Sequence, residues 1–267
     1  MLSKVRELPS ELDGAGASEQ AFAVEARSVW KRYRRYAHRN LSLKGQVIDL
    51  LNGRRNRYVE FDALRDVSFD VPHGQMLAIV GRNGAGKSTL LRILAGVVEP
   101  DAGKVEARGR VSPLLELGAG FAYELSGRRN IYLYGALLGL SRREITEQLD
   151  SIIEFSEIGD FMDTPIKHYS TGMYVRLAFA VAAHLKPDVL LLDEVLAVGD
   201  AAFQAKCRAR IEEFRRAGKT IILVTHALPD VIQMCDRALL LEHGVILDDG
   251  RPDDVLATYS QVLAQTP

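Results

Sequence analysis

The sequence predicts an α/β protein with a mostly parallel core sheet and a helical subdomain. Two short apolar strands, "DVLLLDE" and "TIILVTH", alternate with helical segments. Continuous apolar strands of this kind are typical of a parallel sheet buried on both faces. The chain has 267 residues, of which 47% are hydrophobic, which is enough for one large domain with a full core. A strand, a glycine-rich loop and an amphipathic helix also follow one another in residues 76–96, as α/β sheets require.

The elements before that loop are predicted from composition and alternation. Residues 1–20 are polar and lack an apolar period, so we expect a tail. Apolar and polar side chains alternate in residues 22–30, which predicts an edge strand. Residues 31–57 form a basic insertion with nine Lys and Arg residues, opposed only by Asp49. Residues 63–81 predict two strands on either side of a Pro-His-Gly turn.

The elements after the loop include a helical insertion. Ser141 and Glu144 have the spacing of a capping box and precede an apolar stripe, which predicts the start of a helix. The helical subdomain is expected over about 120–185. The whole domain is expected over 21–260, and 261–267 form a second tail.

Composition excludes several classes of protein. The formal net charge of −1 gives no indication of nucleic-acid binding. The longest apolar run, Leu177–Ala183, is far shorter than the ~20 residues of a membrane-spanning helix. The first residues lack the apolar region of a signal peptide. Cys207 and Cys235 have no metal or redox spacing, so we expect reduced thiols in a cytosolic protein.

Residues 81–88 match the pattern G-x-x-x-x-G-K-[ST] between a predicted strand and a predicted helix. Glycines let successive backbone N–H groups converge on a phosphate, and the helix N-terminus adds its positive dipole end. Lys87 is expected to reach the β- and γ-phosphates, and the Ser88 hydroxyl to ligate Mg²⁺. The sequence therefore predicts binding of a nucleoside triphosphate by Asn83, Gly84, Ala85, Gly86, Lys87, Ser88 and Thr89.

Polar residues follow the two apolar strands. Asp193 ends the first strand, where it would hold Mg²⁺, and Glu194 follows it as the candidate base that polarises the attacking water. His226 follows the second strand and is expected to contact the γ-phosphate. Ligands of open α/β sheets bind at this edge, which favours a hydrolytic site there.

Together, residues 81–89, 189–194, 225–226 and the helix mouth Ser170-Thr171-Gly172 resemble the ABC-type ATPase domain in order and spacing. The resemblance covers Val24 to about residue 260 and implies an added antiparallel β-subdomain. It also implies a homodimer in which Ser170, Thr171 and Gly172 face the γ-phosphate bound to a second copy.

The same resemblance assigns three further residues. Asp200, in "AVGD", matches the dimer-contact loop of the family. Tyr33 lies where the family stacks an aromatic ring on adenine, with Tyr36 and Tyr58 as alternatives. The glutamine of the family's Q-loop is absent, and Glu116 takes its place as a candidate Mg²⁺ or water ligand.

"LLELGAGF" and "YSTGM" resemble the ATP-binding subunits of polysaccharide exporters, which serve O-antigen, capsule and teichoic acid. The resemblance implies that ATP and Mg²⁺ power export of a lipid-linked polysaccharide through a separate permease dimer. The chain would then lie at the cytoplasmic face of the inner membrane, with no nucleic-acid partner. The alternatives are an ABC ATPase that exports another substrate, a soluble non-transport ABC ATPase, and a scaffold without turnover.

Two interpretations of the basic insertion remain open. It forms a solvated positive face, or its arginines lie near anionic lipid headgroups or a pyrophosphate-linked substrate. The residues concerned are Arg34, Arg35, Arg39, Arg54, Arg55 and Arg57.

Overall fold

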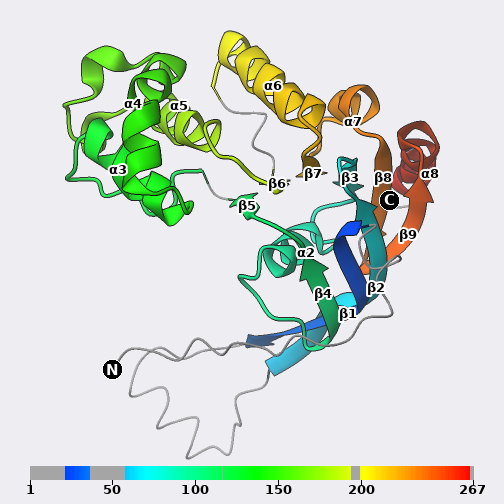
Figure 1. Ribbon diagram of the computed structural model, residues 1–267. Helices are drawn as coiled ribbons and strands as arrows, with labels where there is room; N and C mark the ends of the chain where they lie inside the picture. Colours follow the sequence, from blue (N-terminus) through cyan, green and yellow to red (C-terminus); the bar gives the residue numbers. More distant parts are fainter. Residues whose placement is uncertain (1–21, 37–57, 116, 194–198, 265–267) are drawn as a thin grey trace, which may run out of the picture.

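The computed structural model describes residues 22–36, 58–115, 117–193 and 199–264, arranged around two sheets (Figure 1). The smaller sheet is antiparallel and has the strand order β2-β1-β4. Its strands are β1 (Phe22–Tyr36), β2 (Tyr58–Pro72) and β4 (Ala102–Ala107).

The larger sheet has six strands in the order β5-β6-β7-β3-β8-β9. Every neighbouring pair is parallel except β8 and β9, which form an antiparallel hairpin. The strands are β3 (Met76–Val80), β5 (Val111–Leu114), β6 (Val189–Asp193), β7 (Thr220–Val224), β8 (Arg237–Glu242) and β9 (Val245–Gly250). The predicted mostly parallel sheet is therefore confirmed.

Strand β3 lies in the middle of this sheet and contributes to two cores. Met76, Ala78 and Val80 pack into a cluster with the helices on one face. Leu77 and Ile79 point the other way, into a cluster shared with the antiparallel sheet and with α2 (Lys87–Leu94). The alternation of a β-strand thus buries both faces of β3, which explains its continuous apolar sequence.

The remaining helices form two groups (Figure 1). The helical subdomain contains α3 (Gly127–Leu137), α4 (Arg142–Ser156) and α5 (Thr171–Ala182), with short 3₁₀ turns at Gly159–Phe161 and Ile166–His168. The core carries α6 (Ala201–Arg216), α7 (Leu228–Met234) and α8 (Pro252–Ala264).

The predicted capping box starts α4. The Ser141 hydroxyl accepts a hydrogen bond from the Glu144 backbone N–H at 3.3 Å, and the Glu144 carboxylate accepts one from the Ser141 N–H at 2.7 Å. Two N–H groups that the helix itself leaves unpaired are thereby satisfied.

The prediction of an edge strand at residues 22–30 was wrong. Strand β1 lies between β2 and β4, and it continues through the first six residues of the basic insertion. Alternation alone gives no indication of what pairs with a strand on either side.

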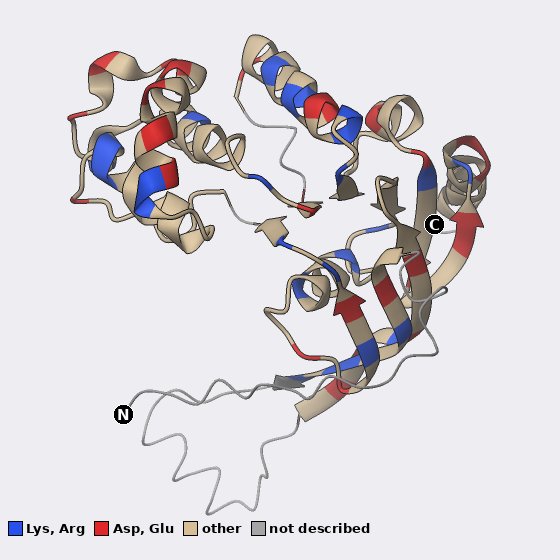
Figure 2. Ribbon diagram, viewed as in Figure 1, with Lys and Arg blue, Asp and Glu red and all other residues tan. Residues whose placement is uncertain are grey.

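Pairing of β1 with β2 also brings acidic side chains beside the basic side chains of that segment. Arg32 donates to Asp62 at 2.6 Å, and Arg34 donates to Glu60 at 2.9 Å, so acids of β2 oppose the bases of β1. Figure 2 shows acidic and basic residues interspersed over the strands and helices. The Arg35 side chain, together with Arg39, Arg54, Arg55 and Arg57, lies outside the described residues. The domain limits and both predicted tails stay predictions.

Candidate active site

The glycine-rich loop between β3 and α2 has a backbone that other residues cannot adopt. Gly86, which precedes α2, has a φ of 110°. A Cβ atom on Gly86 would lie 2.5 Å from the Ala63 carbonyl oxygen and 2.9 Å from a methyl group of Leu64. A Cβ atom on Gly81 would overlap the Leu241 carbonyl oxygen. The loop therefore needs glycine at both positions because of its own fold.

Distant parts of the chain hold this loop in place. The Gly244 N–H, in the turn between β8 and β9, donates to the Ala85 carbonyl at 2.9 Å. The Arg65 N–H donates to the Gly244 carbonyl at 2.7 Å, and its guanidinium donates to the His243 carbonyl at 2.7 and 3.2 Å. The loop is thus clamped between β2 and the β8–β9 turn.

Lys87 is buried, with 6% of its surface exposed. Its ammonium donates to the carbonyl oxygens of Gly81 at 2.7 Å and Arg82 at 2.9 Å. These bonds compensate the cost of burying a positive charge. They also keep the ammonium beside the N-terminus of α2, where the helix dipole favours an anion.

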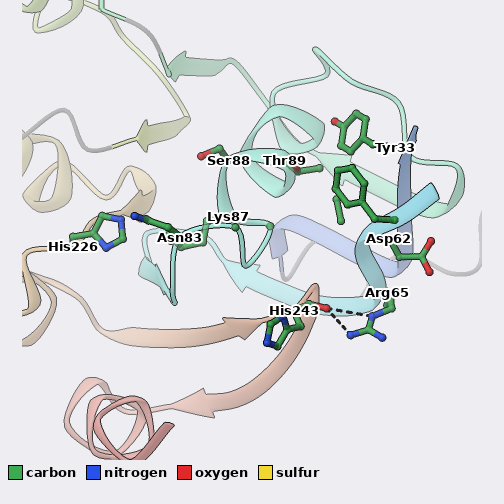
Figure 3. A pocket seen from close by; sticks show the side chains of 13 residues that line it. Tyr33, Asp62, Arg65, Asn83, Lys87, Ser88, Thr89, His226 and His243 are labelled. Atoms are coloured by element: carbon green, nitrogen blue, oxygen red, sulfur yellow. Dashed lines mark hydrogen bonds between the residues drawn. The ribbon is translucent and has the colours of Figure 1, made fainter. Parts of the chain in front are cut away.

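A pocket of about 620 Å³ opens over this loop (Figure 3). Seven of the nucleotide-binding residues predicted from sequence line it, and so does His226. Ala85 does not line it, because its methyl group is buried beneath the loop. The predicted residues in the lining are Tyr33, Asn83, Gly84, Gly86, Lys87, Ser88, Thr89 and His226, joined by Phe61, Asp62, Ala63, Arg65 and His243.

Two aromatic rings line this pocket, and one of them, Tyr33, lies at the far end from Lys87 (Figure 3). Tyr33 of β1 and Phe61 of β2 are directly opposite each other in the strand register, with ring centroids 6.0 Å apart and planes at 36°. Of the alternatives, Tyr58 does not line the pocket, and the Arg34 guanidinium lies over its ring at 4.9 Å. The side chain of Tyr36 is outside the described residues.

Sequence reasoning missed Phe61, Arg65 and His243. The exposure of Phe61, at 49%, is unusual for such a large apolar side chain. Its sequence neighbours alone give no indication of the register that places it opposite Tyr33. A signal was available for His243, since "EHG" between the apolar runs "ALLL" and "VIL" is typical of a turn between two strands.

The carboxyl ends of β6 and β7 reach the same edge of the sheet. Asp193 is the last residue of β6 and pairs with Val224, the last residue of β7. Thr225 and His226 follow β7 directly, and Figure 3 shows the His226 ring beside Asn83. Glu194 and Glu116, two of the predicted site residues, lie outside the described residues.

The segment Ser170-Thr171-Gly172 lies at the exposed mouth of α5 and shares no residue with the pocket over the glycine-rich loop. The Ser170 hydroxyl caps the helix by accepting from the Met173 N–H at 3.2 Å. Among the described residues, a Cβ atom on Gly172 would meet nothing nearer than the Ser170 hydroxyl, at 3.8 Å. The chain's own fold therefore does not explain why a glycine stands here.

Asp200 caps the start of α6. Its carboxylate accepts from the Phe203 N–H at 2.9 Å and from the Arg176 guanidinium at 2.5 Å. The bond from the Phe203 N–H, with a further contribution from Arg176, holds the pKa of this carboxyl below its ordinary value.

Comparison with known proteins places this geometry in a family. A family model described as "ABC transporter" matches residues 64–197. The O-antigen export system ATP-binding protein RfbB of Klebsiella pneumoniae is 45% identical over 243 residues, covering 89% of this chain and 97% of RfbB. The chain belongs to the ABC transporter family. Its predicted assignment as an ABC-type ATPase is thereby confirmed.

Other relatives in the family are longer than this chain. ABC transporter protein AbcA of Aeromonas salmonicida is 52% identical over 203 residues, which is 76% of this chain and 66% of AbcA. Teichoic acids export ATP-binding protein TagH of Bacillus cereus is 38% identical over 91% of this chain and 43% of TagH. The chain thus spans about two thirds of AbcA and less than half of TagH.

Solved structures of ABC proteins share the fold. An ATP-binding subunit of an ABC transporter superposes with a TM-score of 0.68 at 23% identity, covering 89% of this chain and 93% of that one. A dimeric post-hydrolysis state of the ATP-binding cassette MJ0796, bound to ADP and Pi, gives 0.67 at 20% identity, covering 86% and 98%. The predicted fold class is therefore confirmed. Within the part of the chain that the structure describes, no helix combines the length and the apolar character needed to cross a bilayer.

Proposed function

We propose that this chain is the ATP-hydrolysing subunit of an ABC exporter that moves a lipid-linked polysaccharide, such as an O-antigen, through a separate permease dimer. The observation that carries the substrate class is the similarity to RfbB over nearly its whole length. The same chemistry would serve export of another substrate, which is the alternative that the first experiment separates.

ATP binds in the pocket over the glycine-rich loop. The backbone N–H groups of the loop and the N-terminus of α2 bind the β-phosphate. Lys87 then exchanges its two carbonyl partners for phosphate oxygens, and hydrogen bonds to charged acceptors are the stronger ones. Adenine stacks on Tyr33 and Phe61, whose rings line the other end of the same pocket.

Mg²⁺ is the expected companion of ATP, and the oxygens present suit it. Hydroxyl and carboxylate oxygens are the hard donors that this ion takes. Ser88, in the pocket lining, and Asp193, at the end of β6, would hold it, with Glu116 as a further candidate ligand. When bound, the ion neutralises charge on the β- and γ-phosphate oxygens.

Hydrolysis requires a group that orients and deprotonates water. Asp193 ends β6 at the sheet edge where ligands of open α/β proteins bind, and Glu194 is the next residue in the sequence. Glu194 acts as general base, and His226 contacts the γ-phosphate from the end of the neighbouring strand. Replacing Glu194 by Gln should lower the hydrolysis rate by roughly 10²–10⁴-fold while ATP still binds. A Glu194→Gln protein that hydrolyses ATP at the normal rate would contradict this assignment.

Each active site is completed by a second copy of the chain. Ser170, Thr171 and Gly172 present an exposed helix N-terminus, which attracts an anion. The open space at Gly172 supports close approach of a ligand from outside the chain. The γ-phosphate bound to the partner is that ligand, so ATP holds two chains together.

The permease is expected to contact the loop before α3, where the sequence offers Phe121 and Tyr123. Tyr123 is 61% exposed and suits this role. Phe121 is 7% exposed and packs edge-on against Tyr134 and Tyr174, with centroids 5.0 Å apart in both pairs. Tyr123 is therefore the residue that we assign to the contact, at the cytoplasmic face of the membrane.

A pull-down tests the proposal. Tagged Glu194→Gln protein, loaded with ATP, is mixed with solubilised membranes of its own host, and the eluate is analysed for proteins and lipid-linked sugar. The expected result is a multispanning membrane protein together with a glycolipid. A Lys87→Met protein, which loses its phosphate contact, is the control for ATP dependence. A permease with no sugar would favour another substrate, and ribosomal or DNA partners would overturn the transport assignment.

A further inference from the structure

We propose that Arg176 is a positioning residue that makes the signature segment, Ser170-Thr171-Gly172, and Asp200 move as one unit toward the partner chain. This inference rests on the ATP-dependent dimer proposed above. Arg176 lies one helical turn after Gly172 on α5, whereas Asp200 is the N-cap residue of α6, a helix of the core.

The guanidinium of Arg176 joins two carboxylates that belong to different bodies. One nitrogen donates to Glu157 at 2.7 Å, and the other donates to Asp200 at 2.5 Å. Glu157 caps the C-terminus of α4 in the helical subdomain, and Asp200 caps the N-terminus of α6 in the core. A single side chain therefore links the signature helix to both caps.

The requirement is for arginine and not for any cation. Its planar fork offers separate N–H groups to the two carboxylates, whereas the ammonium of lysine is a compact point charge. The guanidinium carbon also lies 5.0 Å from the centre of the Phe203 ring, and only 19% of the side chain is exposed. Stacking and limited exposure fix the fork between its partners.

A second connection reinforces the first. Lys206, further along α6, donates to Glu157 and to the Phe155 carbonyl, both at 3.0 Å, and its ammonium lies 4.5 Å from the Phe155 ring centre. Phe203 of α6 packs edge-on against Phe155 and Phe179 of the helical subdomain, with centroids 6.0 and 6.1 Å apart. The first turns of α6 are thus attached to the helical subdomain.

The rest of α6 is attached to the core. Arg208 donates to Asp230 of α7 at 3.1 Å, and Arg215 donates to Asp236, just before β8, at 2.8 Å. Figure 1 shows α6 running from the side of the helical subdomain toward α7. A movement of the helical subdomain is therefore passed to the start of α6 and so to Asp200.

The test is a mutant cycle in full-length Glu194→Gln protein, with ATP-dependent dimerisation measured by analytical ultracentrifugation. Arg176→Met keeps the stem that packs on Phe203 and removes the fork. Asp200→Asn keeps an oxygen to cap α6 and removes the charge. We expect each to raise the dimer Kd roughly 5- to 20-fold, and the double variant to be no worse than the weaker-binding single one.

The matched control is Arg143→Met, which removes an exposed ion pair with Glu147 on α4 that links no second body. It should leave the dimer Kd within about twofold, since such pairs contribute little. ATP binding by the isolated chain, measured by equilibrium dialysis at low protein concentration, should be the same in all variants. Arg176→Lys, which keeps the charge, should give an intermediate dimer Kd and covers the case in which Arg176→Met does not fold.

Three results would overturn the inference. Arg176→Met dimerises like Arg143→Met, or the effects of Arg176→Met and Asp200→Asn simply multiply, or ATP binding by the isolated chain falls as far as dimerisation does. In each case the parent protein still dimerises with ATP, so the proposed function stands. A parent protein that binds ATP without dimerising would reject the proposed composite site and this inference together.

Discussion

The glycine-rich loop before α2 and the signature segment before α5 are both glycine-containing helix mouths, but their glycines have different causes. Gly86 has a φ of 110°, and a Cβ atom there would lie 2.5 Å from the Ala63 carbonyl. A Cβ atom on Gly172 would have 3.8 Å to its nearest neighbour, the Ser170 hydroxyl. The fold of the chain itself therefore requires a glycine at position 86. It does not require one at position 172, so we look for the reason in a ligand or partner outside the chain.

The surroundings of the two mouths differ in the same way. The first has a buried lysine, a clamp from the β8–β9 turn and a pocket lined by several elements. The second is exposed at Ser170, Thr171 and Gly172. The first helix mouth is thus enclosed by its own chain, whereas the second presents an exposed helix N-terminus.

Alanine at the two glycines should give the largest effects and the clearest contrast. Gly86→Ala places a methyl group against backbone and in an unfavourable φ region, so we expect a loss of about 3–5 kcal/mol of unfolding free energy and of ATP binding. Gly172→Ala should leave the unfolding free energy within about 0.5 kcal/mol, because the new methyl group would make only an ordinary contact, 3.8 Å from the Ser170 hydroxyl. Urea titration measures the unfolding free energy of each variant, and equilibrium dialysis measures its ATP binding.

The same Gly172→Ala protein should fail to dimerise with ATP in the Glu194→Gln background, although it binds ATP normally. Dimerisation equal to that of the parent would remove the external ligand from the explanation of Gly172.

The loop before α3 offers a similar comparison, because Phe121 is buried within the chain whereas Tyr123 is exposed. Phe121→Ala deletes a buried ring and should cost about 3–4 kcal/mol of unfolding free energy. Tyr123→Ala should cost under about 1 kcal/mol, keep the ATPase rate of the isolated subunit and lower export. Chemical denaturation measures the loss of stability in each variant, and an export assay in cells measures the loss of export. Normal export with Tyr123→Ala would reject its permease contact.

Phe61→Ala should have the smallest effect of the three sets, confined to the base end of the pocket. Loss of one stacking ring should weaken ATP binding by roughly 1–3 kcal/mol, and kcat should be unchanged because the phosphate contacts stay in place. Tyr58→Ala is the matched control, since that ring lies outside the pocket lining. Equal ATP affinities for the two variants would exclude Phe61 from the base platform.

The parts of the site that are contiguous in sequence could be predicted, and those assembled by register could not. Residues Asn83 to Thr89 are consecutive, running from the glycine-rich loop into the first turn of α2, so their spacing was sufficient. Phe61 and His243 reach the same pocket through the pairing of β1 with β2 and the turn after β8. Local charge counting failed for the same reason at Arg32 and Arg34, whose acidic partners are on the neighbouring strand.

Two tyrosines on either side of the signature segment make contacts that only the fold shows. The Tyr169 hydroxyl donates to the Phe161 carbonyl at 2.7 Å and occupies the space that a side chain on Gly127 would fill. The Tyr174 hydroxyl donates to the Gly118 carbonyl at 2.7 Å, and a Cβ atom on Gly118 would lie 2.6 Å from that ring. Gly118 of "GAGF" and Tyr174, the residue after "YSTGM", therefore pack against each other, whereas Tyr169 packs against Phe161 and Gly127.

The clamp on the glycine-rich loop has a consequence for the order of folding during synthesis. Residues 81–88 leave the ribosome long before Leu241 and Gly244, against which the loop closes. Strand β3 likewise is synthesised before β7 and β8, the two strands with which it pairs. Because parallel pairing needs both partners to be present, we expect a nascent chain to bind a nucleotide only after the β8–β9 hairpin has been translated.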